Sequence, residues 1–433
     1  MITLALESIR NLSPERRQAI MKRSSLDVTA VLDDIKKIVQ EVRQHGDRIA
    51  LDFHRQYKDD ISSADLVASE AEIRAAYESI DPKLLDALKL AAANIEKFHR
   101  AQLDRGMWAI EVQPGILAGR LQRPLDRVGC YIPGGLAKYP STVLMTIIPA
   151  RVAGVSEIIA CTPPDQGMTA NPTTLAAAHL AGATNIYKIG GPWAVASMAY
   201  GTETVPQVDK IVGPGNKYVT AAKLLVFGEV GIDSPAGPSE ALILADESAE
   251  ARLVAIDFLS QAEHDPDAAA VLVTTWEPLA HRVIDLIKEE FHNLPRQEIL
   301  KSAINHHSAV LLAHDLDEAI DFVNHYAPEH LQIITREPFA VLPRIRHAGS
   351  IFLGMYAPVP VGDYASGTNH VLPTGRTARM FSGLSVDDFI KKPTFQHLTK
   401  EGLKSLKDAV VRLAEAEGLP IHARAVAERF RYV

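Results

Sequence analysis

The sequence predicts an α/β protein with two α/β domains in tandem, each built around a parallel sheet, and with helical segments at both ends of the chain. From residue 128 on, short apolar runs end in Gly or Pro and alternate with helix-like segments: "VGCYIPGG", "EIIACTPP", "NIYKIGGP" and "DKIVGPGN". These runs lie about 25 to 30 residues apart, which is the spacing of βαβ units. A second series, "ALILADES", "AAVLVTT", "AVLLAHD" and "SIFLG", predicts the second sheet.

The length of the chain and the changes in its pattern predict where it divides. At 433 residues it exceeds the roughly 250 to 300 residues at which a single core stops growing. The break between the two α/β domains is expected in "DSPAGPSE", residues 233–240. We expect a helical N-terminal region over 1–110 that packs on the α/β core, a first α/β domain over 111–236, a second over 237–384, and a C-terminal helical segment over 385–433.

Apolar residues at helical spacing predict the helices at both ends. Residues 27–45 and residues 71–103 carry this spacing in the N-terminal third, where we find no motif with chemistry. In the C-terminal tail Leu406, Val410 and Leu413 form an apolar stripe, and the helix is expected to end at Gly418.

Composition and charge exclude several classes of protein. Hydrophobic residues make up 47% and charged residues 23% of the chain, as in ordinary globular proteins. The net charge is −8 and no dense basic stretch occurs, so no nucleic-acid partner is expected. The longest apolar runs are shorter than the ~18 residues that a membrane helix needs, so no membrane association is expected.

The first residues and the cysteines predict a cytoplasmic protein. "MITLALESIRNLSPERR" lacks a basic stretch followed by an apolar one, so we expect no signal peptide. Cys130 and Cys161 are the only cysteines; each lies in a strand-like run and neither has CxxC spacing. They are interpreted as buried thiols in a reducing compartment.

The turn "GPGNKY" at residues 213–218 follows a predicted strand and precedes a predicted helix. Such turns expose backbone N–H groups to a phosphate or another polar ligand. The turn lacks the third glycine of a dinucleotide fingerprint and the Gly-Lys-Ser/Thr ending of a Walker A loop. A purely structural turn therefore remains an alternative.

Two short motifs combine residues that suit metal binding and proton transfer. In "SQAEHDPD", Gln261 and His264 are three residues apart at a helix end, so both can point at one ion. The alternative is a histidine that interacts with the helix dipole. In "YAPEHLQI", Glu329 and His330 precede a strand and could share acid and base chemistry, although adjacent pairs of this kind are also common on surfaces.

Two further segments complete the set. "DYASGTNHVLPTG" contains Asp363 and His370 in a loop shaped by glycine and proline. His422 follows the C-terminal helix, close in sequence to Glu417. Together, Gln, His, Asp and His beside a Glu-His pair have the composition of a zinc site with an acid/base pair, because all the ligands are nitrogen or oxygen donors.

At this point the motifs carry a resemblance to a known family. "RVGCYIPGG", "YPSTVLM", "IPARVAGV", "DKIVGPGNKYVTAAK", "AGPSE", "SQAEHDP", "YAPEHL" and "GDYASGTNHVLPT", in this order, resemble histidinol dehydrogenase. The resemblance extends from about residue 110 to the end. It implies two tandem incomplete Rossmann-like domains.

The resemblance also implies an activity, cofactors and a partner. Members of this family use zinc and NAD to oxidise L-histidinol through an aldehyde to L-histidine, the last step of histidine biosynthesis. They are homodimers whose C-terminal segment completes the active site of the partner subunit. The implied zinc ligands are Gln261, His264, Asp363 and His422 of the partner subunit, and the implied catalytic pair is Glu329 and His330. The implied substrate contacts are Ser239, Gln261, His264, His330, Asp363, Glu417 and His422. The implied coenzyme contacts are Tyr131, Asn216 and, at a changed position, Trp193.

The chemistry of the residues is compatible with these roles. Oxidation of an alcohol to an acid removes two hydrides and adds one water, which creates two separate proton transfers. We expect His330 to take the alcohol proton and Glu329 to activate the water. The chain reads "GGPW" where the family usually reads Gly-Gly-Ala-Gln, so Trp193 replaces a glutamine that contacts the dinucleotide. An indole stacks on a ring but does not offer the donor and acceptor of an amide.

Three other functions stay open from the sequence. A related dehydrogenase of the same kind could oxidise another small primary alcohol with zinc and NAD. A zinc hydrolase would use the same ligands to activate water, but it leaves the "GPGN" turn without a role. A binding module without catalytic activity would not need the pair Glu329 and His330.

Overall fold

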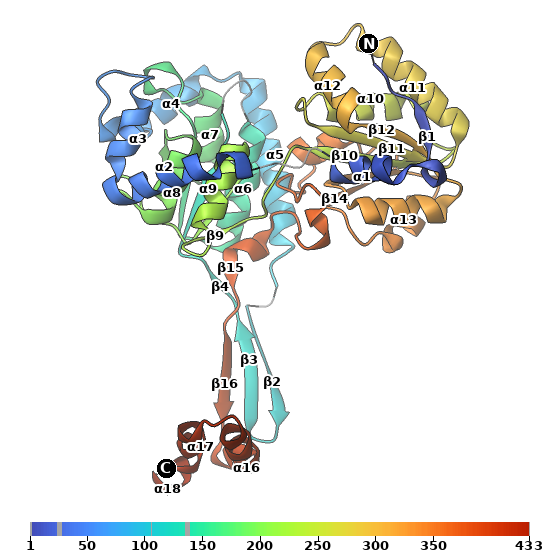
Figure 1. The fold of residues 1–433 in the computed structure, drawn as a ribbon. Helices are drawn as coiled ribbons and strands as arrows, with labels where there is room; N and C mark the ends of the chain where they lie inside the picture. The colour runs from blue at the N-terminus through green and yellow to red at the C-terminus, as the bar shows by residue number, and fades with distance from the viewer. Residues whose placement is uncertain (1, 24–27, 105, 135–138, 433) are drawn as a thin grey trace. The chain divides into compact units, whose positions relative to one another are not determined.

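The computed structural model describes residues 2–23, 28–104, 106–134 and 139–432. The chain divides into two compact units: unit 1 consists of Met1–Gln102 and Asp126–Phe389, and unit 2 of Leu103–Leu125 and Ile390–Val433. Figure 1 shows the chain and its element labels. Unit 1 contains two all-parallel sheets flanked by helices, which confirms the predicted α/β fold class. The domain boundaries at residues 110, 236 and 384 stay a prediction.

The first sheet has the strand order β7-β6-β5-β8-β9, and all neighbouring strands are parallel. Each of the four predicted apolar runs forms one strand, and a helix follows each of them. These elements are β5 (Arg127–Tyr131), α6 (Pro140–Ala153), β6 (Glu157–Cys161), α7 (Pro172–Ala181), β7 (Asn185–Tyr187), α8 (Gly191–Tyr200), β8 (Lys210–Val212), α9 (Lys217–Val226) and β9 (Gly231–Ile232). Gly154 and Gly182 end α6 and α7 with left-handed φ values of 92° and 100°, as glycine allows.

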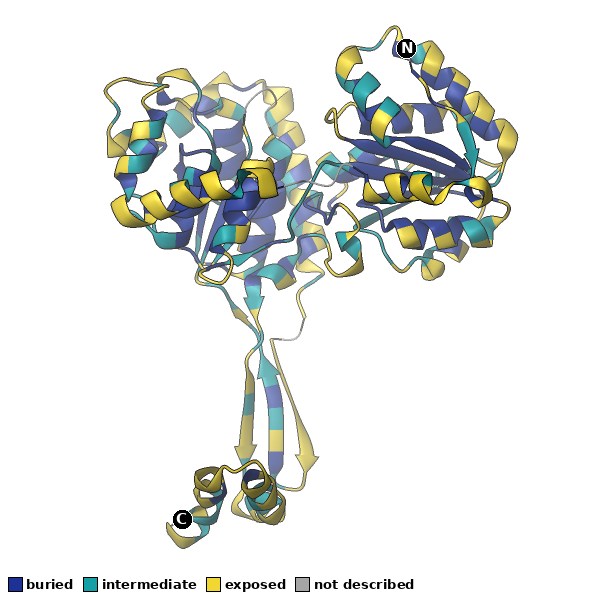
Figure 2. Cartoon of the chain, in the orientation of Figure 1, coloured by how far each residue is buried: buried dark blue, intermediate teal, exposed yellow. Residues whose placement is uncertain are grey.

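The second sheet has the order β1-β12-β11-β10-β13-β14 and is also parallel throughout. Its central strands β10, β11 and β13 are buried along their whole length, as strands covered by helices on both faces must be (Figure 2). Its elements are β1 (Leu6–Ser8), β10 (Glu240–Ala245), α10 (Ala251–Ala262), β11 (Ala269–Thr274), α11 (Glu277–Phe291), α12 (Gln297–His307), β12 (Ala309–Leu312), α13 (Leu316–Tyr326), β13 (His330–Ile334), α14 (Pro338–Val341), β14 (Ser350–Leu353) and α15 (Val359–Tyr364).

The N-terminal region is mostly helical, but it also supplies the edge strand β1. Its helices are α1 (Pro14–Lys22), α2 (Leu32–His45), α3 (Asp47–His54), α4 (Glu70–Ser79) and α5 (Pro82–Arg100). Residue 27, the expected start of the first predicted helix, lies outside the described residues. The stretch over 71–103 is helical as predicted and contains two helices, because Asp81 caps a new helix that begins at Pro82. The apolar face of α2 packs into the core of the first sheet through Ile35 and Val39.

Unit 2 joins two segments that are far apart in the sequence. Strands β2 (Met107–Gln113) and β3 (Ile116–Leu121) form an antiparallel sheet with β16 (Thr394–Leu398), and β4 (Arg123–Pro124) pairs with β15 (Ile390–Lys391). Helices α16 (Lys400–Ala416), α17 (Pro420–Ala427) and α18 (Arg429–Tyr432) follow. The helical tail is therefore preceded by strands that the sequence pattern does not reveal, because their partners lie about 280 residues away.

Short 3₁₀ turns connect several elements: Ile9–Asn11, Thr29–Val31, Ser63–Leu66, Gln166–Met168, Leu342–Arg344, Thr377–Arg379 and Val386–Phe389. Among the described residues, every helix is too short or too polar to cross a membrane. Cys130 and Cys161 are free and buried on neighbouring strands, as expected, and burial raises the pKa of the Cys130 thiol to about 12.

Candidate active site

The candidate site lies where β10 and β13 begin. Because Ala241 is paired with His330 in the parallel register, the segments that enter the two strands run next to each other. This brings Ser239 and Glu240 beside Glu329 and His330, although about 90 residues separate the two pairs in the sequence. The amino ends of two central strands thus place the predicted acid/base pair in the interior of unit 1.

Hydrogen bonds hold Glu329 in this position. Its Oε2 accepts from the Ser239 hydroxyl at 2.9 Å and from the Glu240 backbone N–H at 2.8 Å. The same oxygen lies 3.4 Å from His330 Nδ1, and that nitrogen is also 3.2 Å from the Glu240 carbonyl oxygen. Glu329 and His330 are both buried, with exposed fractions of 6% and 4%. The adjacent pair is therefore a buried acid/base pair and not part of the surface.

Gln261 reaches the same place from the last turn of α10. It is 2% exposed, and its amide nitrogen donates to the Ser239 hydroxyl at 3.1 Å. Its amide oxygen is buried and has no hydrogen-bond partner among the described residues. A buried amide oxygen without a donor is costly, which indicates that the site is built to receive a ligand there. His264 follows the end of the helix and is exposed.

Asp363 lies near the end of α15 and faces His330 from the other side. Its Oδ1 is 3.5 Å from His330 Nε2. The segment "DYASGTNH" folds back on itself, since His370 Nδ1 lies 2.8 Å from the Asp363 carbonyl oxygen and His370 Nε2 lies 3.1 Å from the Thr142 hydroxyl. His370 therefore connects α6 to the backbone of Asp363, a contact that the sequence analysis does not anticipate.

The charges of the site shift two pKa values. Burial alone would lower the pKa of His330, but the carboxylates of Glu329 and Asp363 outweigh it and raise that pKa to about 10. Burial would raise the pKa of Asp363, but the contact with His330 holds it below its ordinary value. An imidazole between two carboxylates is therefore protonated at neutral pH in the structure as it stands.

The residues present fit a metal ion of the zinc type. Gln261 offers an unpaired oxygen, Asp363 a carboxylate and His264 an imidazole, and the charge of His264 acts on Asp363. Among the described residues, no three His, Cys, Asp or Glu side chains come together in a metal-binding arrangement. Unit 1 contains three of the four predicted metal ligands, Gln261, His264 and Asp363.

The two remaining predicted site residues belong to unit 2. Glu417 caps the C-terminal end of α16, and His422 lies in the first turn of α17. Both side chains are exposed. Their participation in a site with Gln261 and Asp363 stays a prediction.

The predicted coenzyme residues gather at the carboxyl edge of the first sheet. Tyr131 ends β5, Trp193 lies in the first turn of α8, and Asn216 caps α9. The Asn216 side-chain oxygen accepts from the backbone N–H groups of Tyr218 and Val219, at 3.1 and 3.2 Å. Ligands of open α/β sheets bind at this edge.

Tyr131 and Trp193 are partly engaged with the protein itself. The Tyr131 hydroxyl accepts from the Gly191 backbone N–H at 3.1 Å, and burial raises the pKa of Tyr131 to about 12. The Trp193 ring stacks on Phe53, with centroids 3.5 Å apart and planes 16° from parallel. One face of the indole is therefore covered by the N-terminal region.

Comparisons with known proteins identify the family. The family model described as histidinol dehydrogenase matches residues 21–430. Curated histidinol dehydrogenases from Methanothermobacter thermautotrophicus and Clostridium acetobutylicum are 51% and 44% identical, and the alignments cover 98% and 96% of this chain and 100% and 96% of theirs. The chain belongs to the histidinol dehydrogenase family.

A solved structure supports the same assignment. The crystal structure of histidinol dehydrogenase from Elizabethkingia anophelis has a TM-score of 0.94 and 38% identity, and covers 100% of this chain and 99% of that one. The expected enzyme class, an NAD-linked oxidoreductase of histidine biosynthesis, is thus confirmed at the level of the histidinol dehydrogenase family.

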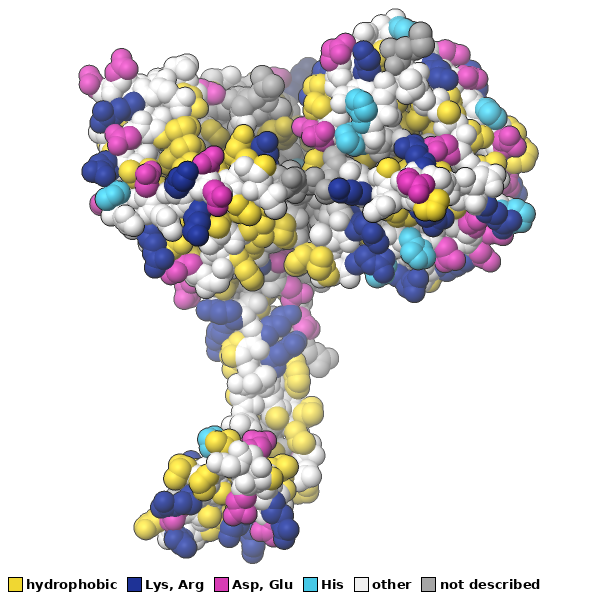
Figure 3. Space-filling model, in the orientation of Figure 1, with side chains coloured by type: hydrophobic (Ala, Val, Ile, Leu, Met, Phe, Trp, Pro, Cys, Tyr) yellow, Lys and Arg dark blue, Asp and Glu magenta, His cyan; other side chains and the backbone are white. Residues whose placement is uncertain are grey.

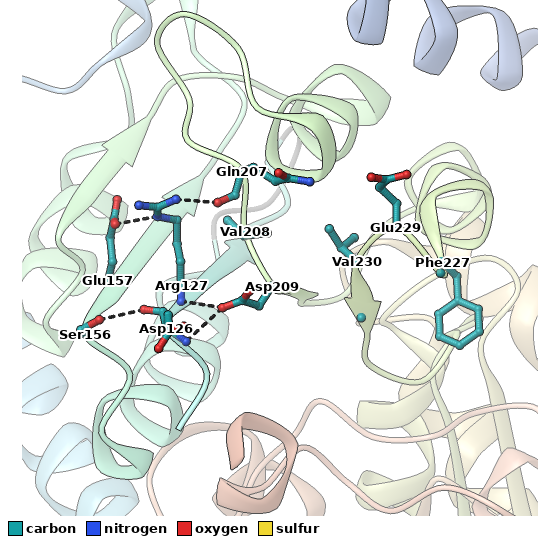
Figure 4. A pocket seen from close by; sticks show the side chains of 12 residues that line it. Asp126, Arg127, Ser156, Glu157, Gln207, Val208, Asp209, Phe227, Glu229 and Val230 are labelled. Carbon is teal, nitrogen blue, oxygen red and sulfur yellow. Dashed lines mark hydrogen bonds and ion pairs between the residues drawn. The ribbon is translucent and has the colours of Figure 1, made fainter. Parts of the chain in front are cut away.

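A separate cavity of about 670 Å³ lies at the amino edge of the first sheet (Figure 4). Several of its polar groups already have partners in the protein: Arg127 contacts Glu157 at 2.6 Å and the Gln207 carbonyl oxygen at 2.8 Å, and Asp209 accepts from the backbone of Arg127 at 2.9 Å. None of the site residues predicted from the resemblance to histidinol dehydrogenase lines it, so this cavity is separate from the candidate site.

Proposed function

We propose that the chain is a zinc- and NAD-dependent dehydrogenase that oxidises L-histidinol to L-histidine through histidinaldehyde, and that it works in the cytoplasm. The observation that supports the mechanism is the buried pair of Glu329 and His330 beside Ser239, Gln261 and Asp363. Membership of the family supports the substrate, because the curated relatives are named for histidinol.

The reaction requires two oxidations with a hydration between them. In the first, the alcohol loses a hydride from carbon and a proton from oxygen and becomes the aldehyde. Water then adds to the aldehyde and gives a hydrate. In the second oxidation, the hydrate loses a hydride and protons and becomes the carboxylate, so that two NAD are reduced for each L-histidinol.

His330 is the base that we assign to the first oxidation. Its Nε2 is buried and makes no hydrogen bond to a described residue, but it lies 3.5 Å from Asp363 Oδ1. Glu329 and Asp363 raise the pKa of the ring to about 10, so that it holds a proton while Asp363 carries its full charge; a metal ion bound by Asp363 would lower this pKa and leave Nε2 to the substrate hydroxyl. Its Nδ1 contacts with Glu329 and Glu240 orient the ring throughout.

Glu329 is the base that we assign to the hydration. Both hydrogen bonds that it receives from described residues end on Oε2, which leaves Oε1 for the incoming water. Ser239 holds the carboxylate from one side while its own oxygen accepts from Gln261. A carboxylate held in this way keeps its orientation while it removes a proton from water.

The metal position is proposed for Gln261, His264 and Asp363, with His422 of the partner subunit as fourth ligand. When bound, zinc would hold the nitrogen atoms of the substrate and reduce the negative charge at Asp363, which lowers the pKa of His330. The hydrogen bond from the Gln261 amide nitrogen to Ser239 orients the amide oxygen that would bind the metal. His370 contacts the backbone carbonyl oxygen of Asp363 and so holds that residue in place.

The coenzyme position is proposed at Tyr131, Asn216 and Trp193. NAD would accept the two hydrides there. The turn before α9 packs closely on the end of β5, because Gly213 has φ +116° and a Cβ at this position would meet the Tyr131 carbonyl oxygen at 2.1 Å. The Asn216 side-chain oxygen caps the helix, and none of the hydrogen bonds among the described residues uses its amide nitrogen.

A second copy of the chain is the proposed partner. Unit 2 exposes apolar side chains on β2 and on the C-terminal helices, many of them visible in Figure 3. An exposed apolar surface of this kind is typical of a protein interface. The side chains are Met107, Trp108, Ile110, Val112, Leu413, Leu419 and Ile421, and His422 lies among the last of them. We propose that this surface is buried in a homodimer and that Glu417 and His422 enter the active site of the partner.

The first experiment measures NADH formed from limiting L-histidinol with excess NAD, with and without a zinc chelator. We expect two NADH per L-histidinol, loss of activity with the chelator, and recovery when zinc is added back. No NADH with zinc present and the dimer intact would overturn the proposed substrate. NADH formation from another small primary alcohol under the same conditions would then identify the chain as a related dehydrogenase.

A further inference from the structure

A buried ion pair lies behind the acid/base pair. Arg23, which directly follows α1, and Glu240, the first residue of β10, have side chains that are 2% and 3% exposed. Arg23 Nε and Glu240 Oε2 are 2.9 Å apart. Neither residue is among the predicted site residues, and the proposed mechanism gives neither of them a proton to transfer.

Glu240 contacts both residues of the catalytic pair. Its side-chain Oε1 accepts from the Glu329 backbone N–H at 3.1 Å, and its own backbone N–H donates to the Glu329 carboxylate at 2.8 Å. Its carbonyl oxygen lies 3.2 Å from His330 Nδ1. The backbone N–H of each glutamate therefore donates to the carboxylate of the other. A shift of Glu240 moves Glu329 and His330 together.

Arg23 makes two further contacts, both with Tyr326, although its buried Nε and Nη1 form no hydrogen bond with described residues. Its guanidinium lies over the Tyr326 ring, with Cζ 3.5 Å from the ring centroid, and it donates to the Tyr326 carbonyl oxygen. Its backbone has φ 54°, a conformation that is unfavourable for any residue with a side chain. Strained residues of this kind persist where the surrounding contacts compensate for the strain, and they are concentrated at functional sites.

The charge of Arg23 is needed because carboxylates crowd this part of the interior. Glu240 and Glu329 are buried next to each other, and Asp363 lies on the far side of His330. Burial raises the pKa of Glu240 to about 7, and Glu329 adds to this rise while Arg23 opposes it. Arg23 therefore offsets part of the negative charge that Glu240 and Glu329 bring into this part of the interior.

We infer that Arg23 and Glu240 are positioning residues: the buried Arg23–Glu240 ion pair holds Glu240 against Glu329 and His330 and so fixes the geometry of the base that activates water. This inference rests on the proposed function. It makes Arg23, at the end of α1, part of the support of the active site, although the sequence there shows no catalytic motif.

The test compares kcat and KM for L-histidinol in the wild-type enzyme with those of Arg23→Gln and Glu240→Asp. Arg23→Gln removes the positive charge of the ion pair. Glu240→Asp keeps the negative charge but shortens the side chain, so that the carboxylate no longer reaches the Glu329 backbone N–H. We expect each variant to lose 10- to 100-fold in kcat, the order of magnitude that a small misplacement of a catalytic group costs, while KM stays within about twofold. The oxidation of added histidinaldehyde is expected to fall at least as much.

Arg16→Gln is the matched control, because Arg16 lies in α1, the helix that Arg23 follows, and forms an ion pair with Glu7 at 2.7 Å away from the site. It is expected to keep the wild-type kcat. A folded Arg23→Gln or Glu240→Asp enzyme with wild-type kcat would overturn the inference, as would an equal loss in Arg16→Gln. If Arg23→Gln does not fold, Glu240→Asp decides alone. A wild-type enzyme that forms no NADH from L-histidinol would overturn the proposed function itself, and the inference with it.

Discussion

Glu329 and His330 are neighbours in the sequence, and the structure gives them different surroundings. Glu329 receives two hydrogen bonds on one oxygen, from Ser239 and from the backbone of Glu240. His330 lies between the carboxylates of Glu329 and Asp363, which raise its pKa. The carboxylate of Glu329 is thus held in one orientation, and the imidazole of His330 lies where neighbouring charges control its pKa. The two proposed proton transfers need these two kinds of group.

The substitution Glu329→Gln is expected to slow the second oxidation more than the first. Gln keeps the size of the side chain but cannot remove a proton from water, so the aldehyde should accumulate and the loss in its oxidation should be on the order of 10²- to 10⁴-fold. Single-turnover measurements of NADH from L-histidinol and from histidinaldehyde check this expectation. An equal loss in both half-reactions would contradict the roles assigned to Glu329 and His330.

Trp193 connects coenzyme binding with the packing of the N-terminal region. Because its ring stacks on Phe53, Trp193→Gln is expected to lower stability by about 1 to 3 kcal/mol. The same variant should lower KM for NAD, since an amide offers both a donor and an acceptor, whereas the indole offers only a donor. Thermal melts and NAD titrations measure both effects.

Phe53→Leu serves as control, because it removes the stack on Trp193 and leaves position 193 unchanged. The same KM for NAD in Trp193→Gln and in the wild type would argue against a coenzyme contact at position 193.

At the scale of elements, two buried histidines link helices of the N-terminal region to the two functional parts of unit 1. His54 of α3 accepts from the Gly190 backbone N–H, at the start of α8, at 3.4 Å. His99 of α5 lies 3.4 Å from the Asn369 side chain in the segment "DYASGTNH". Burial lowers the pKa of both histidines, so both are neutral acceptors in the folded enzyme.

The lowered pKa of His99 predicts a loss of stability in acid that the variant His99→Gln lacks. As pH falls through about 6.5, the unfolded chain binds a proton at this histidine before the folded chain does, so its contribution to the free energy of unfolding decreases. Glu240 and His330, whose pKa values are raised, act in the opposite direction, so the effect is measured as a difference between two proteins. In calorimetry between about pH 7.5 and about pH 5.5 we expect the Tm of the wild type to fall relative to that of His99→Gln. His45→Gln, which changes an exposed histidine of α2, should follow the wild type. A Tm difference between wild type and His99→Gln that does not change with pH would contradict this expectation.

At the scale of the whole molecule, the proposed active site needs two chains. Gln261, Ser239 and Asp363 are contributed by unit 1, whereas His422 lies in unit 2 among exposed apolar side chains. A dimer in which unit 2 is shared would bury that surface and complete the set of ligands at the same time.

Mixed dimers test this arrangement. His422→Asn and Asp363→Asn are each expected to lose activity and to retain less zinc per subunit, measured by elemental analysis. When the two inactive variants are unfolded and refolded together, half of the dimers are mixed and each carries one intact site, so about a quarter of the wild-type activity should return. If all ligands came from one chain, no activity would return on mixing.

Much of unit 1 could be predicted from local sequence. The two series of apolar runs form the strands of the two parallel sheets, because a strand buried on both faces needs a continuous apolar run. The residue types of Gln261, Glu329, His330 and Asp363 made them candidates for the site in the sequence, and their roles stay a prediction. The strands of unit 2 could not, because β3 pairs with β16 over a long sequence separation.

The sequence by itself determined the fold class and the kinds of side chain available for the reaction, because hydrophobic periodicity and donor chemistry are local properties. Only the tertiary structure decided which of these groups meet. The pairing of β10 with β13 joined Ser239 and Glu240 to the catalytic pair, and the end of α1 brought Arg23 to Glu240. Burial and neighbouring charge then decided how His330 and Glu240 titrate, and both depend on contacts between residues that are distant in the chain.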